Sequence, residues 1–385
     1  MIVIENYHVY SMIERIIASN IGNKLFKGKA ILLFGARQVG KTTLLETLLN
    51  RSAYQVMQIS GDEPDVRTLF TGITSTQLRN YIGKNTILYI DEVQRIPEIG
   101  LTLKLITDKI KEVQVMVTGS SALEIANKAN EPLTGRKFVF ELFPLSFAEL
   151  VNHHGLLEEK RQLQNRLLYG SYPEIVSNVN EQEALLKLIA DSYLYKDLLV
   201  LETIKTPKLL EKILKALALQ IGSEVSYNEL ARLVGADKGT IEKYIHLLEQ
   251  TFVIFTLPSF SRNVRNELRK SRKIYFYDCG IRNAVIGNFT PLHLRVDIGA
   301  LWENYLIAER MKVLRYKQSG TSTYFWRTTQ QQEVDFVEEN NGQLRAFELK
   351  WNEHRKVKFS KTFTKAYPEA STEVFTPGNY EEFLL

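Results

Sequence analysis

A glycine-rich loop, Gly-Ala-Arg-Gln-Val-Gly-Lys-Thr at residues 35–42, constrains this chain more than any other feature of its sequence. The apolar run 30–34 precedes the loop and a helix-like segment, 43–49, follows it, so the order is strand, loop and helix. In such a loop several backbone N–H groups turn toward one point, where the helix dipole adds about half a positive charge, and that point favours phosphate. We expect Lys41 to reach the β- and γ-phosphates and the Thr42 hydroxyl to bind Mg²⁺. The residues expected to hold the phosphate-bearing ligand are Gly35, Ala36, Arg37, Gln38, Val39, Gly40, Lys41, Thr42 and Thr43.

The composition excludes several other classes of protein. With 385 residues the chain exceeds one typical hydrophobic core, and we expect three or four domains. Hydrophobic residues make up 44% and charged residues 24%, as in soluble globular proteins, and no apolar run reaches the length of a transmembrane helix. The first residues lack the basic start and long apolar stretch of a signal peptide, so we expect a cytoplasmic protein without a membrane partner. The single cysteine, Cys279, excludes an internal disulfide or a cysteine-based zinc site.

The charge distribution is more informative than the total. A net charge of +5 and a pI near 8.9 do not by themselves indicate a protein that binds nucleic acid. Basic residues gather in two short stretches, 262–273 and 355–365. Each stretch is either a binding surface or an ordinary solvated face.

Two carboxylates end the apolar segment 86–90. A buried parallel strand that delivers acids at its C-terminal end is the partner that a phosphate-binding loop needs. We expect Asp91 to hold the Mg²⁺ and Glu92 to orient and deprotonate an attacking water molecule.

A further strand is expected at residues 113–117, and the small polar residues 118–121 follow it. Two roles are open to Ser120 there: it senses the γ-phosphate or positions the water, or it caps the helix that we expect to begin at Ala122. The two roles are compatible with each other, and the sequence leaves both open.

In this order the motifs resemble the AAA+ class of P-loop ATPases, and more narrowly the prokaryotic proteins that join an AAA+ domain to a DUF4143 region. The segments that carry the resemblance are Gly-Ala-Arg-Gln-Val-Gly-Lys-Thr, Asp-Glu-Val-Gln-Arg-Ile-Pro from Asp91, Leu-Thr-Gly-Arg-Lys from Leu133 and Gly-Ser-Tyr-Pro-Glu from Gly170. The resemblance implies ATP and Mg²⁺ as cofactors. It also implies a parallel-sheet α/β domain over residues 1–145 and a small helical lid over 146–222.

AAA+ proteins usually work as rings, often hexamers, in which an arginine of one subunit contacts the γ-phosphate held by its neighbour. By the family pattern Arg136 is the first candidate for this arginine and Arg95 the second. A salt bridge within the nucleotide domain is the alternative role for either residue. The resemblance therefore implies a homo-oligomer.

Residues 223–290 have the pattern of a helix-turn-helix followed by a basic linker. Ser226 and Asp237 are suited to cap its two helices, and the β-prone segment 252–257 favours a winged version. The positions that enter a DNA groove in such modules are Lys238, Thr240, Lys243 and Tyr244. Such units also pack against proteins, so a protein partner is the alternative to DNA.

Residues 291–385 are expected to form an α/β domain that resembles restriction endonucleases. Asp335 lies on one expected strand and Glu348 and Lys350 lie two residues apart on the next, so their side chains share a face. With Glu303 from the preceding helix they resemble the PD-(D/E)XK nuclease core, whose carboxylates suit Mg²⁺ or Mn²⁺. The alternative is a nuclease-like fold with idle acids that binds DNA or protein.

These patterns support three functional hypotheses. The first is an ATPase of the AAA+ class that couples hydrolysis to binding or remodelling of DNA, including branched DNA. The second is an ATP-dependent switch or scaffold that binds protein partners. The third is an active metal-dependent nuclease.

Overall fold

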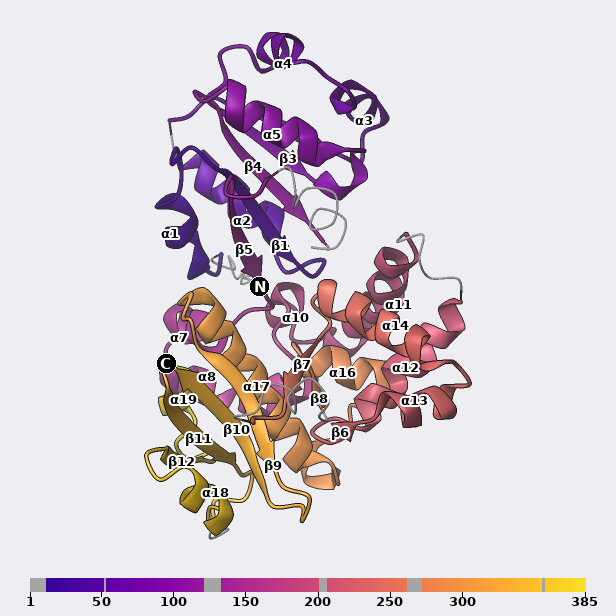
Figure 1. The fold of residues 1–385 in the computed structure, drawn as a ribbon, viewed down its shortest axis with the longest axis vertical. Helices are drawn as coiled ribbons and strands as arrows, with labels where there is room; N and C mark the ends of the chain where they lie inside the picture. The colour runs from indigo at the N-terminus through magenta and orange to yellow at the C-terminus, as the bar shows by residue number, and fades with distance from the viewer. Residues whose placement is uncertain (1–11, 52, 121–132, 201–205, 262–271, 355–356) are drawn as a thin grey trace, which may run out of the picture.

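The computed structural model describes residues 12–51, 53–120, 133–200, 206–261, 272–354 and 357–385, with only the helical backbone for 192–200. Figure 1 shows a parallel sheet with its helices in the upper part of the molecule and the remaining elements below it, joined after β5. Among the described residues no helix is both long enough and apolar enough to cross a lipid bilayer.

The upper part is a five-stranded sheet in the order β2-β3-β4-β1-β5, and all of its strand pairs are parallel. The strands β1, β3 and β4 are buried along almost their whole length, because helices cover the sheet, and their sequences are correspondingly apolar. The predicted α/β class with a parallel P-loop sheet is therefore confirmed. The strands are β1 (Ala30–Gly35), β2 (Val56–Ser60), β3 (Ile87–Asp91), β4 (Gln114–Gly119) and β5 (Lys137–Leu142). The helices are α1 (Ile17–Gly22), α2 (Lys41–Asn50), α3 (Pro64–Phe70), α4 (Ser75–Ile82) and α5 (Ile99–Lys109), with the 3₁₀ turn η1 (Val93–Arg95).

The strand order determines where the predicted site lies. Strand β4 separates β1, which leads into the phosphate-binding loop, from β3, which ends in Asp91. Because the strands are parallel, their C-terminal ends share one edge of the sheet, and ligands of such sheets bind in the crevice outside that edge. The end of β4 therefore lies between the loop and the acids.

A helical region follows β5. The first helix, α7, is stabilised at its start by a capping box in which Ser146 and Glu149 bond each other's backbone N–H groups. Helices α9 and α11 pack against α16, farther along the chain, while α10 lines a cavity together with residues of the phosphate-binding loop. These helices are α7 (Phe147–His154), α8 (Leu156–Arg161), α9 (Leu163–Tyr169), α10 (Pro173–Ser177), α11 (Gln182–Val200) and α12 (Pro207–Leu219).

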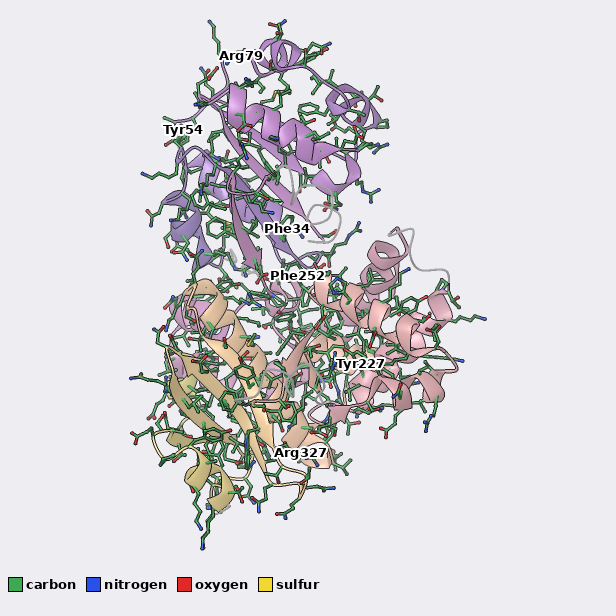
Figure 2. All side chains as sticks on the ribbon, in the orientation of Figure 1. Phe34, Tyr54, Arg79, Tyr227, Phe252 and Arg327 are labelled. Carbon is green, nitrogen blue, oxygen red and sulfur yellow. The ribbon has the colours of Figure 1, made fainter. Side chains whose placement is uncertain are left out.

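The next region contains two helices and a small antiparallel sheet in the order β6-β8-β7. As expected, the side chains of Ser226 and Asp237 accept hydrogen bonds at the starts of α13 and α14. Tyr227, labelled in Figure 2, stacks against the Arg272 guanidinium, 4.3 Å from the ring centroid. The basic stretch predicted at 262–273 lies, up to residue 271, outside the described residues. The elements are β6 (Glu224–Val225), α13 (Tyr227–Val234), α14 (Lys238–Gln250), β7 (Ile254–Pro258), β8 (Arg272–Phe276) and α16 (Cys279–Ile286).

The C-terminal region is a mixed four-stranded sheet in the order β12-β11-β10-β9, as the predicted α/β class requires. Its long first helix, α17, packs against β11 and α19 and also reaches the parallel-sheet domain. The elements are the 3₁₀ turn η2 (Leu292–Leu294), α17 (Ile298–Tyr316), β9 (Ser322–Arg327), β10 (Glu333–Asn340), β11 (Gln343–Leu349), α18 (Lys361–Ala366), β12 (Ser371–Phe375) and α19 (Glu381–Leu384).

An aromatic cluster joins the upper and lower parts. Phe143, just after β5, packs against Phe252, Tyr277 and Tyr316, with ring centroids 6.0, 4.8 and 5.8 Å away. Figure 2 labels Phe252 at this junction. The cluster draws on three regions of the chain, so the parallel sheet and the C-terminal domain share one continuous core.

Candidate functional site

The phosphate-binding loop connects β1 to α2, as the sequence predicts. Gly40 caps α2 with a left-handed backbone, φ 91°, which turns the chain into the helix. Lys41 is only 6% exposed, and its Nζ donates to the carbonyl oxygens of Gly35 and Ala36 at 2.9 and 2.8 Å. The lysine therefore folds back over the loop that it follows.

Gly35 has a structural reason to be glycine. A Cβ atom at this position would lie 2.1 Å from the carbonyl oxygen of Leu142 at the end of β5. The close approach of β1 and β5 therefore requires this glycine, independently of any phosphate.

Asp91 and Thr42, the two residues predicted to hold Mg²⁺, are in direct contact. The Thr42 hydroxyl donates to Asp91 Oδ2 at 2.9 Å. Asp91 Oδ1 accepts from the backbone N–H of Glu92 at 3.0 Å and from the Thr118 hydroxyl at the end of β4. Through these hydrogen bonds the Asp91 carboxylate at the end of β3 links the loop after β1 to the end of β4.

Glu92 lies one residue beyond, with a left-handed backbone at φ 46° that is unusual for a residue with a side chain. Its carboxylate accepts a hydrogen bond from Gln94 Nε2, and the same Nε2 lies 3.2 Å from Ser120 Oγ. Ser120 is buried at the end of β4. The helix that Ser120 was also predicted to cap lies outside the described residues.

The two candidate arginines lie at opposite edges of the sheet. Arg136 precedes β5, and its carbonyl accepts from the N–H of Ala30 at the start of β1, so it lies at the edge away from the phosphate-binding loop. Its Nε donates to Asp108 at 2.6 Å, and this hydrogen bond lowers the pKa of Asp108. Arg95 lies in η1 close to Glu92 and pairs with Asp62 at 2.7 Å.

A cavity of about 510 Å³, which no sequence motif predicts, opens beside the loop. Its walls come from the segment before α1 and α1 itself, from the end of the loop and the length of α2, from Leu145 and from α10. The lining residues include Arg15, Val39, Gly40, Thr43, Pro173 and Ser177.

Arg15 lines this cavity and hydrogen-bonds the phosphate-binding loop. Its guanidinium donates to the carbonyl oxygens of Val39 and Phe143, both at 2.6 Å, and to Glu149 Oε1 at 2.9 Å. It also donates to the Tyr316 hydroxyl at 3.3 Å, at the end of α17. One buried side chain thus contacts the phosphate-binding loop and the C-terminal domain.

Of the four residues predicted to contact DNA, three have side chains that are not buried. Lys238 and Lys243 are exposed at the start of α14, where Lys238 pairs with Glu242 at 3.1 Å, and Thr240 bonds the capping Asp237. The prediction for Tyr244 is wrong, because its side chain is only 4% exposed. The helical period places it on the same face as Ile241, Ile245 and Leu248, which pack into the core.

The C-terminal domain brings three of its four predicted residues together. Lys350 Nζ lies 2.6 Å from Asp335 Oδ2 and 2.6 Å from Glu348 Oε2. Burial and the nearby Asp335 raise the pKa of Glu348 to about 7, although Lys350 acts in the opposite direction. The lysine ammonium therefore occupies the space between the two carboxylates.

Glu303 has different partners. It accepts from Lys273 Nζ at 2.9 Å and from the Tyr275 hydroxyl at 2.6 Å, and burial raises its pKa. Lys273 also bonds Glu333 of β10. In the described parts of the chain no group of three or more acids, histidines or cysteines is arranged to hold a metal ion.

Three family models match the chain in succession. A model described as an AAA domain matches residues 27–151, a domain of unknown function, DUF8612, matches 160–292, and a second, DUF4143, matches 298–382. The first and third agree with the resemblance drawn from the motifs.

Similar proteins come from bacteria and archaea and are described as uncharacterised. A protein of Mycobacterium tuberculosis is 26% identical over 86% of this chain and 73% of its own length. A protein of Methanocaldococcus jannaschii is 23% identical over 91% of this chain and 82% of its own. Among solved structures, a Walker-type ATPase of Pyrococcus abyssi covers 71% of this chain and 96% of its own, with 15% identity and a TM-score of 0.48.

Proposed function

We propose that this chain, which models of an AAA domain and of DUF4143 match in that order, is an Mg²⁺-dependent ATPase. The observation that carries the proposal is the contact between Thr42 and Asp91 at the C-terminal edge of the sheet. It joins the phosphate-binding loop to the acid pair, which is the arrangement that hydrolysis of a nucleoside triphosphate needs.

The residues present fit Mg²⁺. This ion is usually bound through one or two carboxylates together with substrate phosphates, and it keeps several waters. Thr42 and Asp91 supply one hydroxyl and one carboxylate, which explains why no all-protein metal cluster is found among the described residues. When bound, the ion would neutralise charge on the phosphate oxygens.

The chain's own residues would perform the remaining steps. The Lys41 ammonium, which now bonds two neutral carbonyl oxygens, would bind the β- and γ-phosphates through stronger, charge-assisted hydrogen bonds. The Glu92 carboxylate would orient the attacking water and accept its proton. Ser120 would face the γ-phosphate from the end of β4.

The cavity beside the loop is suited to the base and sugar of the nucleotide. Its volume of about 510 Å³ lies within the range of ordinary ligand sites. It begins at Val39, Gly40 and Thr43 of the loop itself, so a ligand whose phosphates lie on the loop would extend into it. The α10 residues Pro173 and Ser177 also line it, which gives the helical region a part in nucleotide binding.

The proposal includes action on DNA, including branched DNA, by a ring of subunits. Helices α13 and α14 with the strands β6 to β8 have the element order of a winged helix-turn-helix, and Lys238 and Lys243 are exposed on the second helix. Arg136 lies at the edge of the sheet away from its own loop, so it would serve only a neighbouring subunit's nucleotide. Arg95 remains the alternative arginine.

We expect the purified chain to hydrolyse ATP only with Mg²⁺, so EDTA should stop the reaction. Duplex, single-stranded or junction DNA should raise the turnover rate, and DNA affinity should fall steeply with salt because phosphate contacts release counterions. The variant Lys238→Ala/Lys243→Ala should weaken DNA binding, whereas Lys84→Ala/Lys111→Ala, which removes two exposed lysines of the ATPase domain, should not. A turnover rate that stays flat across all DNAs would contradict the DNA role and leave the ATPase role intact.

A second candidate function is an ATP-dependent switch that binds protein partners, with a nuclease-like domain that does not cut DNA. The observation in its favour is the position of Lys350 between Asp335 and Glu348, together with the bond of Lys273 to Glu303. A metal ion at these carboxylates would have to displace an ammonium group that already neutralises them.

We expect neither wild type nor Glu348→Ala to cleave linear or junction DNA in Mn²⁺ above the background of a mock purification. Metal-dependent cleavage by the wild type that disappears in Glu348→Ala would establish the nuclease hypothesis instead. Equal cleavage by both proteins would exclude these acids from the mechanism. The measurement is a gel assay of end-labelled DNA with an EDTA control.

A further inference from the structure

In the described part of the chain, Gln94 is the only residue that hydrogen-bonds the Glu92 carboxylate. We propose that Gln94 is a positioning residue of ATP hydrolysis, which holds the Glu92 carboxylate in place and gives the attacking water a hydrogen-bond acceptor. This inference rests on the proposed ATPase function and assigns a role to a residue for which the motifs predict none.

The contacts of Gln94 connect the acid to the end of β4. Its Nε2 donates to Glu92 Oε2 at 2.5 Å and lies 3.2 Å from Ser120 Oγ. The orientation of the amide follows from chemistry, because a carboxylate accepts hydrogen bonds and does not donate them. Gln94 therefore places one donor between the base and the serine that would face the γ-phosphate.

The other end of the same amide has no hydrogen-bond partner among the described residues. Gln94 Oε1 is buried and accepts no hydrogen bond from any described residue. A buried acceptor in that state requires an explanation, because it loses its hydrogen bonds to bulk water without replacement. During hydrolysis the attacking water lies near Glu92. This water can donate a hydrogen bond to Gln94 Oε1.

The backbone around Glu92 is built to keep this geometry. Glu92 has φ 46°, and the 3₁₀ turn η1 begins at the next residue, so Glu92 and Gln94 lie in one tight turn. Gly61 packs against this turn from the end of β2, where a Cβ atom would lie 2.4 Å from the Glu92 carbonyl oxygen. A left-handed backbone at a residue with a side chain is strained and is found where the surroundings enforce it, often at active sites.

The substitution Gln94→Met tests the role, because methionine keeps the length and volume of glutamine and removes both hydrogen-bonding groups. We expect kcat for ATP hydrolysis to fall by about 10-fold or more, since a small misplacement of a catalytic group has effects of that order. The affinity for ATP, measured by titration of a fluorescent nucleotide, should stay within about twofold, because Gln94 does not line the cavity and its hydrogen bonds to described residues go to Glu92 and Ser120. Gln94→Glu should lose still more activity, because it places a second carboxylate beside Glu92.

A matched control is Gln58→Met. Gln58 also donates to a glutamate, Glu46, at 3.1 Å in the same domain, but it lies exposed on β2 away from the acid pair. Its kcat and ATP affinity should equal those of wild type.

A double-mutant cycle shows whether Gln94 acts through Glu92. If it does, adding Gln94→Met to Glu92→Gln should change the residual rate by less than twofold, although Gln94→Met alone lowers it about 10-fold. A wild-type kcat for Gln94→Met, a rise in kcat, or a loss of ATP affinity in parallel with kcat would overturn the inference. A wild-type chain that hydrolyses no ATP would instead contradict the proposed function, so the two failures are distinguishable.

Discussion

Glu92→Gln is expected to bind ATP about as tightly as wild type and to hydrolyse it about 100- to 1,000-fold more slowly, as expected for loss of a general base. Glutamine keeps the size of the side chain and an oxygen that can accept from Gln94 Nε2, but it cannot accept the proton of the attacking water. The measurement is steady-state ATP hydrolysis beside nucleotide titration, so that binding and chemistry are separated.

The matched control is Glu98→Gln. Glu98 is an exposed glutamate six positions farther on, and like Glu92 it has a left-handed backbone, with φ 50°. The same change of acid to amide there should leave kcat unaltered. If Glu98→Gln slowed hydrolysis as much as Glu92→Gln, the effect would reflect the folding of this segment and Glu92 would not be the base.

Lys41→Ala tests the phosphate-binding part of the site, whereas Glu92→Gln tests the chemical step. Its ammonium is expected to bind phosphate in the ground state as well as in the transition state, so its removal should weaken ATP binding together with hydrolysis. Glu92→Gln should leave binding intact. An unchanged hydrolysis rate in Lys41→Ala would contradict the central assignment of the site.

The sequence predicted those parts of the site whose residues and supporting strand lie close together in the chain. The loop 35–42 and the acids Asp91 and Glu92 each follow an apolar strand directly, so a short window contains both the chemistry and its support. That Thr42 and Asp91 would meet followed from the rule that parallel strands end at one edge. The mixed α/β class of the C-terminal domain followed similarly from alternating strands with acids at set positions.

The parts that the sequence did not predict depend on contacts between distant segments. The cavity beside the loop combines walls from the segment before α1 and from α10, which are more than a hundred positions apart in the chain. Gln94 lies inside a recognised motif, but only the left-handed turn at Glu92 brings its amide to the carboxylate. Tyr244 was assigned to DNA from its place in a motif, whereas its helical period assigns it to the core.

The sequence around Arg15 does not predict its role. Its partners Phe143, Glu149 and Tyr316 lie more than a hundred residues away in the chain. It neutralises Glu149, whose side chain is fully buried and also caps α7. Tyr316 in turn accepts from the N–H of Phe143 at 3.2 Å, and its carbonyl accepts from Asn20 at 2.8 Å. The phosphate-binding loop and the C-terminal domain are therefore hydrogen-bonded to the same guanidinium.

We expect Arg15→Met to lower the free energy of unfolding by about 3 to 5 kcal/mol, because removing one member of a buried ion pair leaves the other charge unpaired. The double variant Arg15→Met/Glu149→Gln should recover a large part of this loss, since it leaves no buried unpaired charge. The exposed pair of Arg51 and Glu14, at 3.2 Å, provides the control, and Arg51→Met should change stability little. Urea denaturation followed by tryptophan fluorescence reports the C-terminal domain, which contains Trp302, Trp326 and Trp351. If Arg15→Met left that transition unchanged while weakening ATP binding, Arg15 would support the loop alone, and the C-terminal domain would not depend on it for stability.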